Sequence, residues 1–290
     1  MKIIVGSAAG SAPDTFARWW GDHLTKILGQ AFIVDNKPGA AGSLSAGLVA
    51  SATDQHTLLW AISSTMTINP HVYPKTTFDV RKDFVPVAPA MKQAMVLVVN
   101  NDFPARTLQD IVQMARKSPG SISYGSYGVA GYPHVLMEWF CDATGIRMVH
   151  VPYKQAAIID VIAGQIPMVA EPTATALAQI RAGKVRPIAF SGGQRLPALP
   201  DVPTFAEVYP AVGEVAAFHG VYMPSSTPRD VVNRLNAAMN QVSNLPETGK
   251  KVGDMGAQPY PATPEQMAAE VAQEYARWGK FLREKNIKLE

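Results

Sequence analysis

The chain has 290 residues, of which 47% are hydrophobic and 17% charged, so it can bury one large core or two modest ones and is not a disordered chain. Its formal net charge of +3 is too weak, and its basic residues too scattered, to favour nucleic acid or an anionic membrane surface as a partner. Cys141 is the only cysteine, which excludes an internal disulfide and a cysteine-based metal cluster.

The first half of the chain alternates short apolar strands with helices. A helix is expected to begin near Pro13, because proline suits a first helical turn, and to end at Gly29. Between them, Phe16, Trp20 and Leu24 recur at helical spacing. Strands are expected at residues 3–5, 31–34, 58–62, 95–99 and 122–124.

The second half continues this alternation, with strands expected at 148–151, 166–170 and 185–190. Capping patterns predict further helices, among them the one after Thr107 and the last one after Thr263. Strands that alternate with helices predict an α/β fold with mostly parallel sheets flanked by helices. In open sheets of this kind, ligands bind beyond the carboxyl ends of the strands.

Three of these strand ends lead into loops of small, uncharged residues, at 5–14, 63–70 and 124–134. The first and third loops precede a helix, whose start leaves backbone N–H groups unpaired and carries a partial positive charge. Small residues let a ligand come close to those donors. The loops therefore predict a cradle for a carboxylate or phosphate that needs no Lys or Arg.

Polar side chains in these loops also have structural interpretations. Asp14 can orient the helix start without touching a ligand, and Ser64 and Thr65 can be ordinary loop hydroxyls. His134 follows a proline at a helix start, where a lone histidine is more often structural than functional.

Two further candidates lie outside the loops. Glu171 follows the apolar strand at 166–170, where it is either a solvated strand end or an acceptor for a ligand ammonium or hydroxyl. Phe218 and His219 lie between Ala217 and Gly220, and an aromatic residue in such a run is more often core than pocket wall.

Enzyme signatures are missing from the sequence. There is no Gly-x-Ser-x-Gly, Ser-x-x-Lys, His-Glu-x-x-His or Walker A motif, and the glycines at 125, 128 and 131 do not form a dinucleotide fingerprint. The six histidines show no metal-ligand spacing. We therefore expect no metal, no cofactor and no catalysis. The alternative is an α/β enzyme acting on a small acid, with His134 or His219 as acid and base.

Several segments, in this order and spacing, resemble the substrate-binding receptors of tripartite tricarboxylate transporters, also called Bug receptors. Any one segment is a weak match, but together they span nearly the whole chain. They are Ala8-Ala9-Gly10 with Asp14 and Arg18, residues 34–42, 64–70 and 82–87, Tyr124-Gly125-Ser126 with Gly128 and His134, and residues 150–154 and 199–204.

The resemblance implies a two-lobed periplasmic receptor of the type II-like binding-protein fold, with a small carboxylate held in the cleft between the lobes. It implies lobe 1 at residues 1–100 plus 222–290 and lobe 2 at 101–221. In the family, the first loop holds a carboxylate through backbone N–H groups and ordered waters. An acidic residue usually stands where Glu171 does. The family's ligand is delivered to membrane permease subunits.

The chain departs from the family pattern in the first loop, in the third loop and near residue 218, and we expect the first loop to keep its hold on the ligand's near carboxylate. Gly6 and Ser11 replace a usual Pro and Gly, Gly131-Tyr132-Pro133 replaces the usual hydroxyls, and Phe218-His219 stands where Trp-Phe is common. The hypothesis is that the far end meets Tyr132, Phe218 and His219, which favours an aromatic or longer acid. The predicted ligand contacts are Ser7, Ala9, Gly10, Ser11, Asp14, Ser64, Thr65, Gly128, Tyr132, His134, Glu171, Phe218 and His219.

The expected location and partners follow from the same resemblance. We expect a periplasmic monomer that binds a di- or aromatic carboxylate and no nucleic acid. Met1 leads directly into an apolar strand, so we expect either a cytosolic start or a chain whose signal sequence has been removed. A receptor that reports ligand occupancy to a signalling partner is a further alternative, which a neighbouring permease or sensor-kinase gene would separate from transport.

Overall fold

The structure is a computed structural model that describes residues 1–73, 76–153 and 156–288. The chain forms two compact units. Unit 1 comprises Met1–Lys92, Phe218–Gly253 and Gln258–Glu290, and unit 2 comprises Gln93–Ala217 and Asp254–Ala257. Both of the predicted crossings, after residue 100 and after residue 221, therefore fall earlier in the chain. As a result, Phe218 and His219 belong to unit 1.

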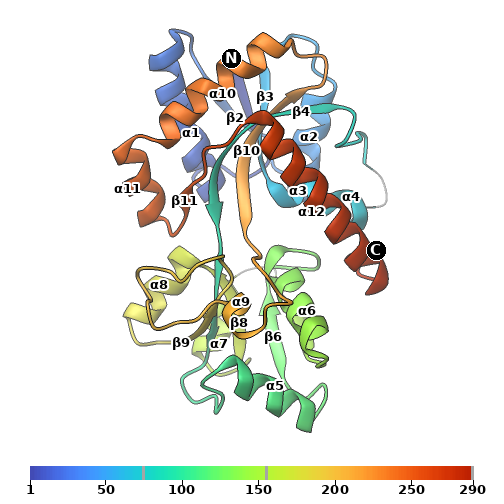
Figure 1. The fold of residues 1–290 in the computed structure, drawn as a ribbon, viewed down its shortest axis with the longest axis vertical. Coiled ribbons are helices and arrows are strands. Elements are labelled where there is room, and N and C mark those ends of the chain that lie inside the picture. Colours follow the sequence, from blue (N-terminus) through green and yellow to red (C-terminus); the bar gives the residue numbers. More distant parts are fainter. Residues whose placement is uncertain (74–75, 154–155, 289–290) are drawn as a thin grey trace. The chain divides into compact units, whose positions relative to one another are not determined.

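Unit 1 is built on a mixed sheet. Its strands are β1 (Lys2–Val5), β2 (Ile33–Asn36), β3 (Thr57–Ile62), β4 (Phe84–Gln93), β10 (Ala217–Pro224) and β11 (Gln258–Pro259). They lie in the order β11-β4-β10-β3-β1-β2 (Figure 1). Strand β1 pairs in parallel with both β2 and β3, whereas β10 runs antiparallel to β3. Two of the parallel strands, β1 and β3, lead into predicted loops.

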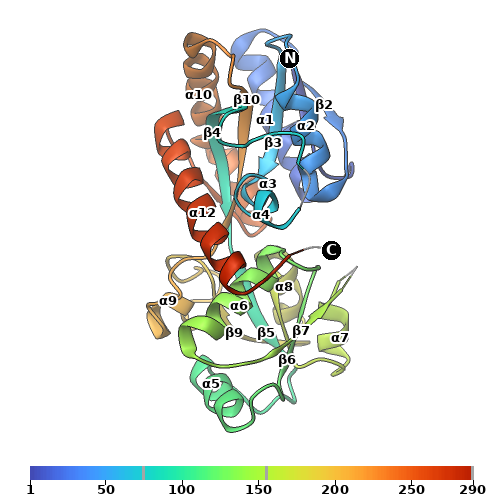
Figure 2. The ribbon, with the colours of Figure 1, turned by 90° about the vertical axis from the view of Figure 1, so that its right-hand side faces the viewer.

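Helices cover this sheet. They are α1 (Ala12–Leu28), η1 (Ala40–Gly42), α2 (Ser43–Ala50), α3 (Ser63–Thr67), α4 (Asn69–Val72), α10 (Arg229–Ser243), α11 (Pro246–Asp254) and α12 (Pro264–Glu284). Helix α1 packs against α10, and α12 packs against α3 and α4 (Figure 2). Pro13 lies in the first turn of α1 and Gly29 ends it in a left-handed conformation, as the sequence predicts. The capping box at Thr263 and Gln266 is also confirmed.

Unit 2 has a second mixed sheet in the order β7-β6-β8-β5-β9. Its elements are β5 (Met95–Val99), α5 (Leu108–Lys117), β6 (Ser123–Ser126), α6 (Tyr132–Thr144), β7 (Val149–Pro152), α7 (Ile158–Ile162), β8 (Met168–Pro172), α8 (Thr173–Arg181), β9 (Arg186–Phe190) and α9 (Phe205–Val208). Strand β6 is parallel to β7 and β8, and β5 is antiparallel to β8 and β9. The carboxyl ends of β6 and β8 therefore meet at one edge of the sheet.

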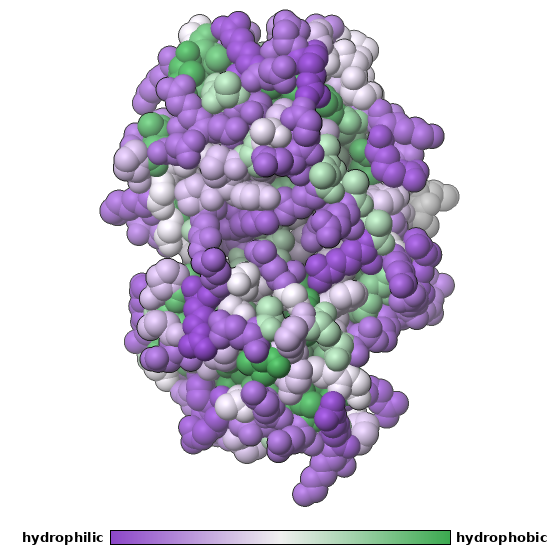
Figure 3. All heavy atoms as spheres, viewed as in Figure 1, coloured by the Kyte–Doolittle hydropathy of each residue, from purple (hydrophilic) through white to green (hydrophobic). Residues whose placement is uncertain are grey.

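Each unit buries its own apolar core. In unit 1, Leu59 of β3 and Phe218 of β10 pack with Met267 of α12. In unit 2, Val96 of β5 and Val169 of β8 pack with residues of α7 and α8. The face drawn in Figure 3 is mostly hydrophilic, with hydrophobic residues in small separate patches. Lys154, the last residue of one family-like segment, lies outside the described residues.

Candidate ligand-binding site

Three loops of unit 1 converge at the carboxyl ends of β1, β2 and β3. They are residues 6–11, residues 37–42 and the start of α3. Because the three strands are parallel, their carboxyl ends lie at the same edge of the sheet. The sequence predicts the first and third of these loops as ligand contacts, but it assigns the middle one no site residue.

Two glycines allow the three loops to touch. A Cβ atom on Gly6 would lie 2.6 Å from both the Gly42 Cα and the Ser45 Oγ. A Cβ atom on Gly42, whose φ is +91°, would lie 2.8 Å from the Thr65 Oγ1. A side chain on Gly6 would therefore displace the Gly42 backbone, and one on Gly42 would displace the Thr65 side chain. Small residues in these loops therefore serve first to bring the loops together, and only then to admit a ligand.

Hydrogen bonds fasten the middle loop in place. The Thr65 hydroxyl donates to the Ala41 carbonyl at 3.2 Å, and the Asn69 side-chain amide donates to the same oxygen at 3.0 Å. The Ser45 hydroxyl donates to the Gly42 carbonyl at 2.6 Å. Ala40 and Ala41 are held at φ values of +46° and +50°, which non-glycine residues rarely adopt. Strain of this kind persists only where the surroundings impose it, and it is common in ligand-binding loops.

These loops enclose a pocket of about 180 Å³ within unit 1. The lining has hydroxyl, backbone and apolar groups and carries no charged side chain: Gly6, Ser7, Pro13, Ala41, Gly42, Ser45, Trp60, Ala61, Ile62, Ser64 and Thr65. Pockets that hold a whole small molecule usually measure about 300–1,000 Å³. The unit 1 pocket is therefore the right size for one end of a ligand and a few waters.

Unpaired donors lie in the first loop and at the start of α3, and of these Ser7 and Ser64 line the pocket. In the part of the chain that the structure describes, the backbone N–H groups of Ser7, Ala8 and Ala9 donate no hydrogen bond to other protein atoms. The Ser64 hydroxyl, which lines the pocket and is partly exposed, has no protein partner there either. Ser11 Oγ is buried and also lacks a partner among the described residues. Uncharged donors near the start of α1 suit an anion.

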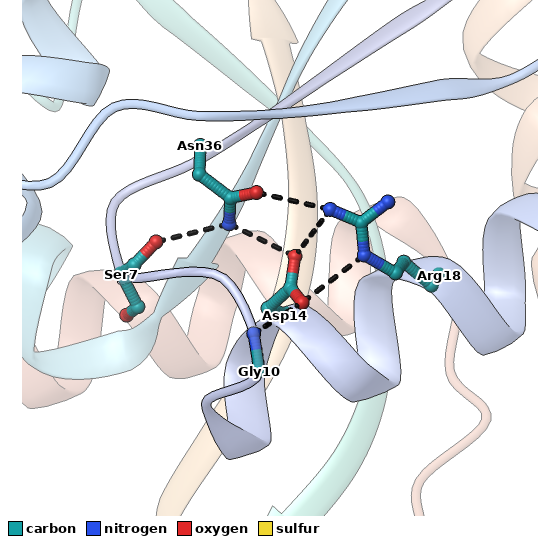
Figure 4. A network of polar contacts seen from close by, with 5 residues as sticks. All are labelled: Ser7, Gly10, Asp14, Arg18 and Asn36. Carbon is teal, nitrogen blue, oxygen red and sulfur yellow. Dashed lines mark hydrogen bonds and ion pairs between the residues drawn. The ribbon is translucent and has the colours of Figure 1, made fainter.

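Asp14 holds the first loop through a network of hydrogen bonds (Figure 4) and is not among the residues that line the pocket. Its carboxylate accepts hydrogen bonds from the Gly10 backbone N–H at 2.8 Å, from Arg18 Nε at 3.0 Å and from Asn36 Nδ2 at 2.9 Å. Asn36 Nδ2 also donates to the Ser7 carbonyl at 3.0 Å. The network ties β2, the first loop and α1 together. The Gly10 N–H is therefore occupied by Asp14 and is not available to a ligand. Asp14 is a positioning residue.

The electrostatics of Asp14 agree with this role. The side chain is buried, which by itself would raise its pKa. Hydrogen bonds from Arg18, Gly10 and Asn36 outweigh burial and hold the pKa of Asp14 below its ordinary value. The carboxylate is thus ionised at neutral pH and its oxygens are occupied by the chain itself.

Phe218 and His219 lie in the interior of unit 1. Phe218 is 1% exposed and belongs to the core cluster beneath β3 and β10. His219 is 2% exposed, its Nδ1 accepts a hydrogen bond from Trp60 Nε1 at 3.4 Å, and its ring lies against Phe16. Burial lowers the pKa of His219 to about 3, so the ring is neutral. These contacts give both side chains a packing role.

The loop predicted at residues 124–134, in unit 2, is held together by hydrogen bonds between its own residues. Ser126 Oγ donates to the Gly128 carbonyl at 2.9 Å and accepts from the Gly128 N–H at 3.2 Å. The Ala130 N–H donates to His134 Nδ1 at 2.9 Å. The His134 ring is stacked on His150 at 3.8 Å. Burial, with a smaller effect of His150, lowers the pKa of His134 to about 3. A neutral, buried imidazole supports the loop and is a poor acid–base catalyst at neutral pH.

The remaining candidates of unit 2 lie beside this loop. The Tyr132 side chain is buried at the start of α6. Glu171, at the end of β8, is completely buried, and the Tyr127 hydroxyl donates to its Oε2. Tyr127 itself is 39% exposed. Sequence reasoning places Glu171 correctly at a strand end but gives no reason to single out Tyr127.

The structure adds Ala41, Gly42 and Trp60 to the lining of the unit 1 pocket. The sequence contains a signal for the first two, because a Pro-Gly-Ala-Ala-Gly run directly after a strand predicts a tight loop at its carboxyl end. The sequence does not indicate Trp60 as a lining residue, because a tryptophan within an apolar strand is expected to lie in the core.

This geometry, with two α/β units and an uncharged pocket at the carboxyl ends of parallel strands, defines a ligand-binding protein. The model of the family described as "Tripartite tricarboxylate transporter family receptor" matches residues 16–287. The chain belongs to this family of solute-binding receptors, which are not enzymes.

Individual relatives support the assignment. A Pseudomonas sp. (strain P51) protein named "UPF0065 protein in tcbD-tcbE intergenic region" is 33% identical over 96% of this chain and 84% of its own length. An R. palustris protein solved with adipate is 28% identical, with a TM-score of 0.85 over 99% of this chain and 97% of that one. MatC from Rhodopseudomonas palustris, solved with malate, is 27% identical, with a TM-score of 0.79 over 97% of each chain. The fold is thus the two-lobed periplasmic binding-protein fold.

Proposed function

We propose that the protein is a periplasmic receptor that captures a dicarboxylate and delivers it to the membrane permease of a tripartite transporter. One observation carries the proposal: the unit 1 pocket is uncharged, lined by hydroxyls and placed beside unpaired backbone N–H groups. Such a pocket binds a carboxylate through neutral donors. Among the described helices, none is long and apolar enough to cross a membrane.

The choice of a dicarboxylate rests on two arguments. Adipate and malate, the ligands of the two solved relatives named above, both carry two carboxylates. The pocket's volume of about 180 Å³ suits one carboxylate and its waters, so the rest of the ligand must find its contacts elsewhere. The hypothesis of an aromatic ligand depended on Tyr132, Phe218 and His219. Phe218 and His219 are buried against core residues of unit 1, and Tyr132 is buried at the start of α6, so none of the three supports an aromatic ligand.

A thermal-shift panel tests the proposal. The purified protein is unfolded and refolded to remove any bound metabolite, then heated with mono-, di- and tricarboxylates, acidic amino acids and aromatic acids. A ligand at about a hundred times its Kd adds roughly 2.7 kcal/mol to the free energy of unfolding. For a chain of this size, that raises the Tm by several degrees.

We expect dicarboxylates to give the largest shift. A panel in which only aromatic acids or only amino acids raise the Tm would overturn the proposed ligand class. A flat panel from a refolded protein that retains its cooperative transition would overturn the receptor proposal itself.

A further inference from the structure

Glu171 in unit 2 is a buried carboxyl group whose Oε1 forms no hydrogen bond with the described residues, although the Ile158 backbone N–H lies near the carboxyl group. The residue is 0% exposed. The Tyr127 hydroxyl donates to Oε2, whereas Oε1 is buried and has no hydrogen-bond partner among the described residues. Buried polar atoms are nearly always paired, so an unpaired oxygen on a titratable group requires an explanation, and a water, an ion or a ligand group can each supply the missing partner.

Among the described residues, no basic side chain forms an ion pair with Glu171, and Arg181, the one Lys or Arg on the elements packed against β8, is exposed at the far end of α8. Strand β8 packs against β5, β6, α6, α7 and α8. The titratable or charged groups on these elements and on the adjoining loop are Tyr124, Tyr127, Tyr132, His134, Glu138, Cys141, Asp142, Asp160 and Arg181.

Several of these groups are engaged with one another. Glu138 accepts from Tyr124, Asp160 accepts from Tyr153, and His134 is stacked on His150. Within the described ranges, Tyr127 alone places a side-chain donor on the Glu171 carboxyl. A carboxyl group that is buried without a cationic partner favours its neutral form.

The pKa agrees with this geometry. Burial raises the pKa of Glu171 to about 7, and the Tyr127 hydroxyl and the nearby Ile158 backbone N–H offset part of the rise. Below neutral pH, Glu171 is therefore mostly neutral and presents an O–H group that needs an acceptor. An ionised carboxylate is the strongest acceptor for it, whereas an ammonium or hydroxyl donor would suit the ionised form of Glu171 instead.

We propose that Glu171 binds one carboxylate of the ligand as a neutral acid, donating its O–H while Tyr127 holds its other oxygen. The inference rests on the proposed function, because it requires the ligand to be a dicarboxylate. No covalent bond changes: the proton stays on Glu171 and is shared with the ligand oxygen. Above neutral pH, where free Glu171 is ionised, binding must take up one proton from solvent.

The experiment is a calorimetric titration of the refolded protein with adipate between pH 6.5 and 8.5, where both ligand carboxylates are ionised. We expect the adipate affinity to fall about tenfold per pH unit above roughly pH 7. Repeating the titration in buffers with different ionisation enthalpies should show uptake of about one proton at the alkaline end. Hexanoate, of the same length with one carboxylate, should show no proton uptake.

Variants separate this role from a merely structural one. Glu171→Gln keeps a hydrogen-bond donor that does not titrate, so its adipate affinity should become independent of pH over this range. Glu207→Gln, at an exposed ion pair with Arg195 in the same unit, should keep the wild-type pH dependence.

The outcomes distinguish this inference from the proposed function. Adipate binding that is independent of pH in the wild type, or that tightens as the pH rises, would overturn the role of Glu171 and leave the receptor function standing. Failure of every carboxylate to bind at any pH would overturn both. If Glu171→Gln does not fold, the proton uptake of the wild type still decides.

Discussion

At the scale of single residues, the polar groups around the unit 1 pocket divide into those that build the site and those that remain available to a ligand. Asp14, Thr65 and Asn69 direct their polar atoms at backbone groups of neighbouring loops. Ser64 and the N–H groups of residues 7–9 keep theirs free among the described residues. The residues with paired groups hold the loops in place, and the unpaired donors on those loops remain available to bind a ligand.

Asp14→Asn tests the positioning role. Losing the charge weakens the bonds from Gly10 and Arg18, so we expect the free energy of unfolding at pH 7 to fall by about 1–3 kcal/mol. The ligand affinity should fall as well, because the first loop is no longer held. Asp22→Asn, at an exposed position on the same helix, is the matched control. Equal effects of the two substitutions in denaturant unfolding would contradict the role.

The same residue sets a pH dependence. The folded pKa of Asp14 is lowered, so its contribution to stability is present above the ordinary value of 3.8 and is lost as the pH falls through the folded pKa. The difference in stability between wild type and Asp14→Asn should therefore be constant near neutral pH and shrink below about pH 4. Unfolding curves at several pH values measure it. A difference that grows on acidification would show that the sign is wrong.

At the scale of elements, the close contact of three loops explains why this strand edge is so rich in glycine. Gly6→Ala would place a Cβ atom 2.6 Å from the Gly42 Cα, so the loops must separate. We expect a loss of about 1–3 kcal/mol in stability together with a clear loss of carboxylate affinity. Gly29→Ala has open space but a φ of +66°, so it should lower the Tm while leaving the affinity unchanged. Unchanged affinity in Gly6→Ala would separate these loops from the ligand.

Much of the element pattern is predictable from local sequence. Capping boxes such as Thr107 with Asp110 and the glycine stop at Gly29 act over a few residues, so their signals survive without tertiary context. Strand β10 is not predictable in this way, because His219 and Gly220 interrupt its apolar run. The structure shows that this histidine is buried against Trp60 and Phe16, a long-range contact that no local pattern contains.

The site was predictable in outline for the same reason. Loops at the carboxyl ends of parallel strands follow from the alternation of strands and helices. The alternation of strands and helices does not predict which hydrogen-bond donors remain unpaired, because that depends on contacts between segments distant in sequence. Asn36 reaching Asp14 and Tyr127 reaching Glu171 are two examples.

At the scale of the whole molecule, the two units each carry a distinct piece of binding chemistry. Unit 1 offers neutral donors for a carboxylate, and unit 2 offers a buried carboxyl with one unpaired oxygen. The family and fold assignments rest on matches along nearly the entire chain, so they describe both units together. Ligand identity depends on a few side chains, so it must be measured by binding.

The most direct test of the carboxylate pocket is a calorimetric titration of refolded wild type, Ser64→Ala and Ser226→Ala with adipate and with malate. Ser64 lines the pocket, whereas Ser226 is an exposed serine of the same unit that does not line it. We predict saturable binding of at least one of these acids, a loss of about 1–3 kcal/mol, or roughly 5- to 150-fold in affinity, in Ser64→Ala, and no loss in Ser226→Ala. Equal affinity of all three proteins for the acid that binds would show that the carboxylate lies elsewhere.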